Sequence, residues 1–239
     1  METRIVTRQY AALIPIKDHS ERVPGKNFRS LAGRPLWQHI VATLQDMDEV
    51  GAIYIDTDSD RFTPDVLAPF PKVRVITRPQ ELRGDFVATN ALFAYDLTRI
   101  PAEITHFLQT HTTNPLLSPA TIRRAIAAFE GAAAEGARDS LFTVTPCYNR
   151  FYRRDGSAIN HDPKVLIRTQ DLEPLLEENS NLYLFSRESF AATGARIGAR
   201  PMLFEMDGME ATDIDDELGW DLADFLMARQ TRREAKDPA

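Results

Sequence analysis

The sequence predicts an α/β domain of three layers, α/β/α, built on a mostly parallel sheet. Short apolar, β-branched runs alternate along the chain with segments that carry apolar residues at helical spacing. Strands that alternate with helices need crossover connections, so we expect a mostly parallel sheet covered by helices on both faces. The 239 residues, 43% of them hydrophobic, suffice for a single domain, 1–239, with a small lobe inserted into it.

The expected elements follow one another in a regular order. Five apolar runs are predicted as strands, namely 10–16, 51–57, 73–77, 105–110 and 140–145. Three helices are predicted between them, at 35–47, 86–98 and 118–130. Ser118 and Pro119 mark the start of the last helix, because serine caps a helix and proline suits its first position.

This rhythm breaks between about 147 and 180, where the chain is polar. Asp155-Gly156 in this stretch favours a tight hairpin turn. We interpret the stretch as a small inserted lobe or dimerisation arm. Two late strands, 181–186 and 202–207, and a closing helix at 216–230 are predicted after it, with a frayed tail at 231–239. The closing helix carries one apolar face, formed by Leu218, Leu222, Phe225 and Leu226.

Charge and cysteine content argue against several classes of protein. The 28 basic and 35 acidic residues give a net charge of −7, which disfavours a nucleic-acid or anionic-membrane binder. A single cysteine, Cys147, leaves no intrachain disulfide and no cysteine-based zinc site. No run approaches the roughly 18 apolar residues of a membrane span. The first ten residues lack the apolar core of a signal peptide, so a cytoplasmic protein is expected.

The loop behind the first predicted strand concentrates positive charge. Residues 14–27 read IPIKDHSERVPGKN and include Lys17, Arg22 and Lys26. Ligands of parallel sheets bind outside the carboxyl ends of the strands, where such a loop can hold a polyphosphate. The loop is not a P-loop, because Asn27 follows Lys26 where that motif has serine or threonine. A solvated loop with scattered charges is the alternative.

A pair of carboxylates precedes the closing helix, in the stretch ATDIDDELGW. If this stretch is extended, Asp213 and Asp215 project to the same side, because side chains alternate along a strand. Two neighbouring carboxylates suit Mg²⁺, which keeps several waters and bridges to substrate phosphates. The alternative is that Asp215 or Asp216 only caps the helix and that Asp213 is solvated.

Further polar groups follow the other predicted strands. The stretch YIDTDSD brings Asp56 and Asp58, and Arg78 follows the next strand. The stretch LQTHTTNPLL contributes Gln109, His111, Thr112 and Asn114. Cations and carboxylates thus fall on different strand ends, as an anionic substrate with a metal ion requires. The combination favours an enzyme.

Taken together, these motifs resemble the acylneuraminate cytidylyltransferase family over about residues 11–228. Residues 14–27 match the length of its first motif, I-P-A-R-x-x-S-x-x-x-P-x-K-N, with Ser20, Lys26 and Asn27 at marked positions. The stretch TRPQELRGDFVAT resembles its R-P-x-x-L-x-x-D segment and places Arg78 and Asp85. THTTNPLL, ENSNLYLF and ATDIDDELGWDLADFL are similar to later motifs of the family, in the same order.

The resemblance implies a nucleotidyltransferase-like fold that transfers CMP from CTP to a sugar acid and releases pyrophosphate. Lys26 would stabilise the phosphates, and Asp213 with Asp215 would hold Mg²⁺. A homodimer through the lobe is implied as well. Nucleotide contacts are expected from Ile14, Pro15, Lys17, Ser20, Arg22, Lys26, Asn27, Arg78 and Asp85. Acceptor contacts are expected from Gln109, His111, Thr112, Asn114, Arg168, Gln170 and Asn179.

Departures from the family pattern cluster on the acceptor side. His111 stands in place of a glutamine, and Glu177-Glu178 in place of Arg-Pro. Arg168 is a candidate to take over the contact to an acceptor carboxylate. The resemblance implies a nonulosonic acid as the acceptor, and these departures support the alternatives, an octulosonate or a phosphonate. A nucleotide-binding protein without catalysis and a glycosyltransferase with a D-x-D motif are competing functions, but the charged loop favours nucleotidyl transfer.

Overall fold

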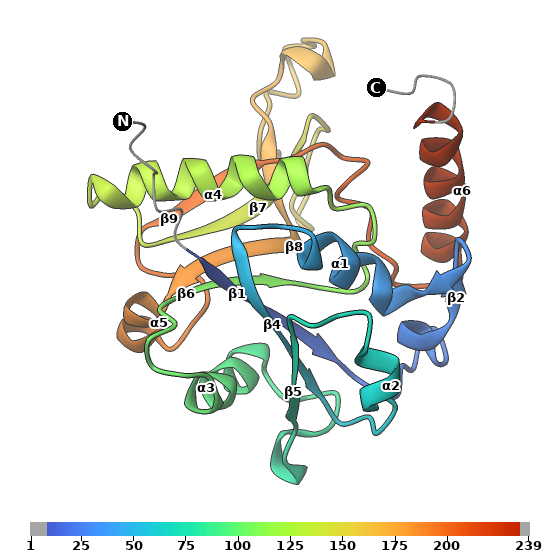
Figure 1. The fold of residues 1–239 in the computed structure, drawn as a ribbon. Helices are drawn as coiled ribbons and strands as arrows, with labels where there is room; N and C mark the ends of the chain where they lie inside the picture. The colour runs from blue at the N-terminus through green and yellow to red at the C-terminus, as the bar shows by residue number, and fades with distance from the viewer. Residues whose placement is uncertain (1–8, 235–239) are drawn as a thin grey trace, which may run out of the picture.

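A seven-stranded sheet runs through the molecule, in the order β5-β4-β1-β6-β8-β7-β9 (Figure 1). The computed structural model describes residues 9–234, so the first eight residues and positions 235–239 of the predicted tail lie outside it. The strands are β1 (Tyr10–Ile16), β4 (Val50–Thr57), β5 (Val73–Thr77), β6 (His106–Thr110), β7 (Ser140–Cys147), β8 (Leu175–Ser186) and β9 (Pro201–Glu205). β8 is antiparallel to β6 and β7, and the other pairs are parallel. The predicted mostly parallel sheet is confirmed.

Helices cover both faces of the sheet, which confirms the three layers. One face packs on α1 (Leu36–Gln45) and α4 (Pro119–Ala134), and the other on α3 (Thr89–Arg99) and α5 (Arg187–Thr193). Ser118 caps α4 as predicted, since its side chain accepts a hydrogen bond from the Thr121 N–H. No helix within residues 9–234 has the length and apolar character needed to cross a membrane.

Short elements complete the chain between the main ones. They are η1 (Lys26–Phe28), β2 (Ser30–Leu31), β3 (Arg34–Pro35), α2 (Pro64–Leu67), η2 (Gln80–Leu82) and η3 (Thr169–Asp171). β2 and β3 pair with each other as a separate small ribbon next to η1. This ribbon lies beside the amino-terminal part of the last helix, α6 (Glu217–Glu234).

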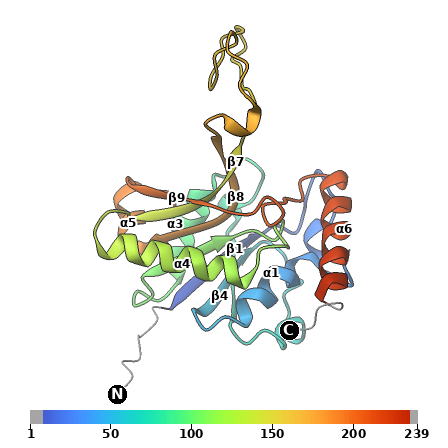
Figure 2. The ribbon, with the colours of Figure 1, turned by 90° about the horizontal axis from the view of Figure 1, so that it is seen from above.

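The segment between β7 and β8 projects away from the sheet as a narrow lobe (Figure 2). At its base, residues 144–147 of β7 pair with 175–178 of β8 and extend the two strands as a ribbon. β8 is therefore longer than the strand predicted at 181–186. The predicted turn is present, because Gly156 has a positive φ of 87° next to Asp155. The lobe leaves apolar side chains exposed, among them Tyr152, Val165 and Leu166.

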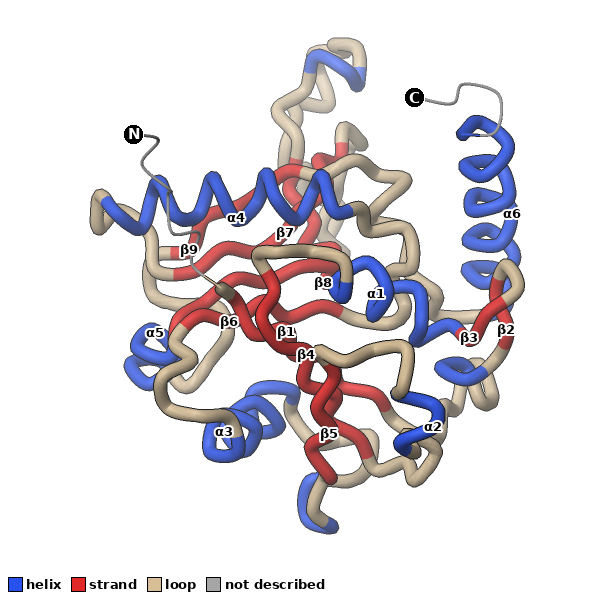
Figure 3. The backbone as a smooth tube through the Cα atoms, viewed as in Figure 1, coloured by secondary structure: helices blue, strands red, loops and turns tan. Residues whose placement is uncertain are grey.

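The prediction for the packing face of α6 was wrong. Leu218, Leu222 and Phe225 are exposed by 76, 47 and 56%. The helix instead buries Trp220 and Ala223 against the first loop and the β2-β3 ribbon. Figure 3 shows the reason, because α6 stands beside this ribbon rather than on the sheet. The helix also extends through 231–234, part of the tail that was predicted to fray.

Asp96, on α3, is a buried carboxyl close enough to Asp56 and Arg78 for their charges to act on it. It is 1% exposed, and its Oδ1 accepts no hydrogen bond from residues 9–234. Burial, and secondarily the charge of Asp56, raise the pKa of Asp96 to about 8, although Arg78 opposes the shift. Asp96 is therefore protonated in the folded protein at neutral pH.

Asp96→Asn is expected to stabilise the protein near pH 8 by about 1–3 kcal/mol. From the unfolded pKa of about 4 upward, the unfolded chain has released a proton that the folded protein retains. The free energy of unfolding therefore falls as pH rises from about 4 towards 8, and the asparagine variant should lack this part of the fall. Urea unfolding at pH 5, 6.5 and 8 measures the effect, with Asp221→Asn on the exposed side of α6 as control. A loss of stability in Asp96→Asn at pH 8 would contradict this assignment.

Candidate active site

A cavity of about 620 Å³ lies at the carboxyl ends of β1, β5 and β6. Its volume is within the range of small-molecule sites. The acidic segment before α6 contributes to its wall. The predicted site residues that line it are Pro15, Lys17, Ser20, Arg22, Lys26, Asn27, Arg78, Asp85, His111, Thr112, Asp213 and Asp215.

The first loop is held in shape by one asparagine. The Asn27 side-chain amide donates to the Lys17 carbonyl over 2.8 Å, and its Oδ1 accepts from the Thr112 hydroxyl at 2.6 Å. Gly25, with φ of 63°, turns the chain into η1 just before Lys26. A side chain here would be strained, because L-residues rarely adopt this left-handed conformation. Asn27 thus joins the loop to the end of β6.

The ammonium group of Lys26 connects this loop to the acidic segment. Its Nζ donates to the Ile214 carbonyl over 2.7 Å, and the residue is 9% exposed. Burial lowers the pKa of Lys26, while the nearby charges of Asp213 and Asp215 act in the opposite direction. Lys26 is therefore a largely buried cation within electrostatic range of both Asp213 and Asp215.

The acidic segment is a loop rather than the extended strand considered above. Asp213 and Asp215 nevertheless line the same cavity, since the Ile214 side chain between them is fully buried. The Ile214 N–H donates to the Thr113 carbonyl over 2.9 Å, and the Asn114 amide donates to the Thr212 carbonyl over 3.3 Å. Burial raises the pKa of Asp213, and the charge of Asp215 adds to the shift.

Gly219 brings α6 into close contact with this segment. A Cβ atom at Gly219 would lie 2.9 Å from the Asp213 carbonyl oxygen and 3.4 Å from the Ile214 Cα. Both neighbours are backbone atoms, which cannot give way as the end of a flexible side chain can. The first turn of α6 therefore fixes the position of Asp213, and only glycine fits there.

Two exposed ion pairs lie at the mouth of the cavity. Lys17 contacts Asp85 at 2.9 Å, and Arg22 contacts Asp215 at 2.9 Å. Each pair joins a cation of the first loop to a carboxylate from another part of the chain. Three residues that were predicted to contact the nucleotide therefore form ion pairs within the protein itself, namely Lys17, Arg22 and Asp85.

Arg78 lies in the wall of the cavity, almost fully buried. Its Nε donates to both carboxylate oxygens of Asp56, over 3.1 and 3.2 Å, and Nη2 donates to the Asp56 carbonyl. Nη1 has no hydrogen-bond partner in the part of the chain that the structure describes. Nη1 is itself buried, so the predicted nucleotide contact of Arg78 stays a prediction. The D-x-D reading of Asp56 and Asp58 loses support, because Asp56 is bound to Arg78 and Asp58 accepts from the Asp18 N–H.

The predicted acceptor residues are dispersed. His111 and Thr112 line the cavity, and Gln109 lies fully buried behind His111. Asn114 is buried against the acidic segment. Asn179 lines an adjoining hollow, which also reaches Asp213 and Asp215. Ile14, on the nucleotide side, has its side chain in the hydrophobic core.

Arg168 and Gln170 lie on the lobe, outside the cavity. The Arg168 side chain is 72% exposed and contacts Asp171 at 2.6 Å. A role for these two residues in acceptor binding therefore stays a prediction that requires a second subunit.

Sequence reasoning missed several residues that line or frame the cavity, among them Ser180, Arg196 and Gly219. Ser180 has a positive φ of 54° where the register of β7 and β8 shifts. Arg196 follows α5 in the stretch GARIGARP, in which no known motif marks it. A positive φ at a non-glycine residue and a largely buried arginine are visible only in three dimensions.

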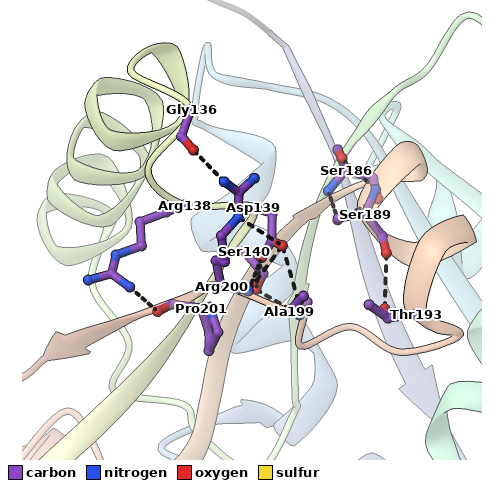
Figure 4. A network of polar contacts seen from close by, with 11 residues as sticks. Gly136, Arg138, Asp139, Ser140, Ser186, Ser189, Thr193, Ala199, Arg200 and Pro201 are labelled. Carbon is purple, nitrogen blue, oxygen red and sulfur yellow. Dashed lines mark hydrogen bonds and ion pairs between the residues drawn. The ribbon is translucent and has the colours of Figure 1, made fainter.

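A larger hollow, of about 1080 Å³, lies at the opposite end of the strands. Figure 4 shows that its polar groups are largely engaged with one another. Asp139 accepts from the N–H groups of Ala199 and Arg200, while the side chains of Arg138 and Arg200 donate to carbonyl oxygens. These contacts serve to fix the loop before β9. The smaller cavity, with its cations and paired carboxylates, is the better candidate for chemistry.

Comparison with known proteins assigns the chain to a family. The family model described as cytidylyltransferase matches residues 11–217, which include the first loop and the acidic pair. The chain belongs to the cytidylyltransferase family. The predicted resemblance to the acylneuraminate branch is confirmed by curated relatives of the chain.

The CMP-N,N'-diacetyllegionaminic acid synthase of Legionella pneumophila is 26% identical over 228 residues, which are 90% of this chain and 95% of that protein. The N-acylneuraminate cytidylyltransferase A of Danio rerio is 25% identical over 93% of this chain, which spans 52% of that longer protein. A 3-deoxy-manno-octulosonate cytidylyltransferase of Anaeromyxobacter dehalogenans is 34% identical over 76% of this chain and 75% of its own.

Solved structures support the observed fold. CMP:2-keto-3-deoxy-manno-octonic acid synthetase in complex with CTP covers 93% of this chain and 99% of its own, with a TM-score of 0.61 and 14% identity. A 4-diphosphocytidyl-2C-methyl-D-erythritol synthase covers 92% and 99%, with a TM-score of 0.63 and 18% identity. Likeness at this level of identity concerns the fold alone.

Proposed function

We propose that the protein transfers CMP from CTP to a nonulosonic sugar acid and releases pyrophosphate. The observation that carries the proposal is the meeting of Lys26 with Asp213 and Asp215 in one cavity, beside the cationic first loop. A triphosphate needs concentrated positive charge, and this loop offers it in a protein that is acidic overall. The family and the names of its relatives support the same reaction.

The reaction forms one bond and breaks one. A hydroxyl oxygen of the acceptor attacks the α-phosphorus of CTP, the bond from that phosphorus to the bridging oxygen breaks, pyrophosphate leaves, and the hydroxyl proton is released. Negative charge grows on the α-phosphate oxygens and on the leaving group. Lys26 would face this charge from a site with little water, where a fixed cation acts strongly. Lys17 and Arg22 would hold the outer phosphates, and Asn27 keeps the loop that carries all three cations in place.

The acidic pair fits Mg²⁺. Asp213 Oδ1 is buried and accepts no hydrogen bond from residues 9–234, as expected of an oxygen whose partner is a bound ligand. No cluster of three acidic, histidine or cysteine side chains suited to a metal occurs among these residues. Two carboxylates suit an ion that takes its other ligands from water and phosphate. When bound, Mg²⁺ would withdraw charge from the phosphates.

Pyrophosphate release tests the proposal. We expect turnover with CTP in the presence of Mg²⁺, and little with ATP, GTP or UTP, across N-acetylneuraminate, legionaminate, pseudaminate, an octulosonate and simple phosphonates. A nonulosonate as the best acceptor would support the proposal. Tight CTP binding without turnover on any of these acids would contradict it and favour the non-catalytic alternative.

An octulosonate is the second candidate acceptor. The 34% identity to the Anaeromyxobacter dehalogenans relative, over three quarters of both chains, favours it. Glu177-Glu178, in place of the Arg-Pro of the acylneuraminate motif, also departs from a nonulosonate site. Both candidates are sugar acids, so the same acceptor panel separates them.

We also propose that the lobe joins two subunits. On this lobe Leu166 and Val165 are 85 and 55% exposed, and Tyr152 is 53% exposed. Apolar groups on a projecting segment gain free energy when a second copy covers them. The same contact would carry Arg168 and Gln170 to the neighbouring subunit, as the sequence comparison implies.

Replacing Val165 and Leu166 together with glutamate is expected to convert a dimer into a monomer, because two charges would enter an apolar contact. Sedimentation velocity at several protein concentrations measures the mass. Exchanging Leu218 and Leu222, which are exposed on α6, for glutamate is the matched control. A dimer that survives the lobe substitutions, with a fold unchanged by circular dichroism, would refute this role of the lobe.

A further inference from the structure

Arg196 places a nearly buried guanidinium group in the wall of the cavity. Its side chain is 15% exposed, and it lines the cavity together with Lys26, His111 and Asp213. The guanidinium carbon lies 3.6 Å from the centre of the Tyr183 ring. Stacking on an aromatic face holds the planar group in one orientation. Neither the family motifs nor the sequence pattern assigns a role to this arginine.

A hydrogen-bond chain fixes the orientation of Arg196. Its Nη1 donates to Gln109 Oε1 over 2.6 Å, so the other end of this amide is the NH₂ group. That group donates to the Thr110 carbonyl over 3.1 Å and lies 3.0 Å from His111 Nε2. Since the amide nitrogen can only donate, His111 Nε2 accepts, and the ring hydrogen is on Nδ1. The buried Gln109 thus sets both the arginine and the histidine tautomer.

The remaining donors of Arg196 are available. Its Nη2 lies 3.9 Å from Glu178 Oε1, too far for a hydrogen bond. Glu178 instead accepts from the Tyr183 hydroxyl. Within residues 9–234, neither Nη2 nor Nε donates a hydrogen bond to another residue. A desolvated guanidinium with two unused donors suits a carboxylate, whose two oxygens match the fork geometry.

His111 lies within electrostatic range of both cations of the cavity. Burial, then the charges of Arg196 and Lys26, lower the pKa of His111 to about 4. The ring is therefore neutral at physiological pH. With Nε2 engaged by Gln109, it can offer a hydrogen through Nδ1 but cannot readily accept one. These features disfavour His111 as a general base.

We propose that Arg196 binds the carboxylate of the sugar-acid acceptor, and that Gln109 and Tyr183 position it for this task. The inference rests on the proposed function and names the residue that would select an acidic acceptor. Arg196 then binds the carboxylate of the acceptor, and Lys26 binds the phosphates of CTP. Arg168, the residue that the sequence suggested, is exposed on the lobe and paired with Asp171.

Steady-state kinetics of Arg196→Gln test the proposal. We expect the KM for the acceptor to rise about 10- to 100-fold, as for loss of a charge-assisted hydrogen bond, with the KM for CTP within about twofold of wild type. The methyl ester of the acceptor should bind the variant and the wild type equally. Arg196→Lys should fall between them, because lysine keeps the charge but not the fork. Arg138→Gln, at the far end of the strands, is the control.

Each alternative has a distinct outcome. If the KM for CTP rises as much as that for the acceptor, the anion is a phosphate oxygen and the proposal is overturned. It is also overturned if Arg168→Gln raises the acceptor KM and Arg196→Gln does not. A calorimetric titration of the acid into protein saturated with a non-transferable CTP analogue needs no turnover. Binding to wild type that is lost in Arg196→Gln supports the proposal even if no transfer is detected, and equal binding to both overturns it.

Discussion

Lys26→Ala is expected to lower kcat with CTP and a sugar acid by about 10²–10³-fold, because it removes a preorganised cation from the reacting phosphates. The buried position of Lys26, 9% exposed, makes the effect large, since water screens its charge little. Lys17→Ala removes an exposed cation of the same loop and should act mainly on the KM for CTP. Initial rates of pyrophosphate release at saturating substrates measure both.

Lys26 also donates to the Ile214 carbonyl, so its loss leaves that acceptor without its partner. Lys26→Arg keeps a donor and a charge and separates the two effects. We expect the arginine variant to retain the melting temperature and to recover only part of the rate, because a planar guanidinium does not fit the space of an ammonium. A Lys26→Ala enzyme with unchanged kcat and an intact fold would show that Lys26 has no part in the reaction.

Asp213→Asn and Asp215→Asn are each expected to reduce turnover by about 10²-fold or more and to weaken the dependence of the rate on Mg²⁺. The Asp213 variant should be the more severe, because this half-buried carboxylate has a buried oxygen, Oδ1, without a partner among residues 9–234. Amides keep the shape of the side chains but lose the charge that a hard cation requires.

Binding of Mn²⁺ in the presence of CTP, followed by electron paramagnetic resonance, tests the metal role without turnover. We expect the Kd for Mn²⁺ to rise at least tenfold in both acidic-pair variants. Asp58→Asn, a change in the other D-x-D stretch, should leave it unaltered, because Asp58 accepts from the Asp18 N–H. If Asp58→Asn weakens Mn²⁺ binding and Asp213→Asn does not, the metal would have to be sought at the first D-x-D stretch.

The sheet and its helices were predictable because the β-branched runs and the helical periodicity are local signals. The strands β1, β4, β5, β6 and β7 lie within a few residues of their predicted bounds. The first loop and the acidic pair were also visible, since charged residues directly behind a strand indicate a site at the edge of a parallel sheet.

Features that depend on distant contacts could not be read in this way. The apolar stripe of α6 at Leu218, Leu222 and Phe225 is real, yet the helix packs through Trp220, because its neighbour is the small β2-β3 ribbon. Arg196 comes to the cavity only because α5 returns the chain to the sheet. In the sequence, Gly219 indicates only a weaker helix. The structure shows that glycine is needed there, because the Asp213 carbonyl leaves no room for a Cβ atom.

The ion pairs at the mouth of the cavity bear on how a triphosphate would enter. Lys17 with Asp85, and Arg22 with Asp215, are half-exposed, and pairs of this kind are worth about 0–1 kcal/mol each. The carboxylates of Asp85 and Asp215 therefore pair with the cations before a nucleotide binds, and these pairs keep the loop ordered and its cations apart. The phosphates of a bound nucleotide would replace these carboxylates as partners of Lys17 and Arg22. This exchange would cost little free energy, and the loop would already be ordered. Binding of the nucleotide would free Asp215 from Arg22, and the freed carboxylate could then bind the Mg²⁺ that accompanies the nucleotide. Nucleotide and Mg²⁺ are therefore expected to bind cooperatively.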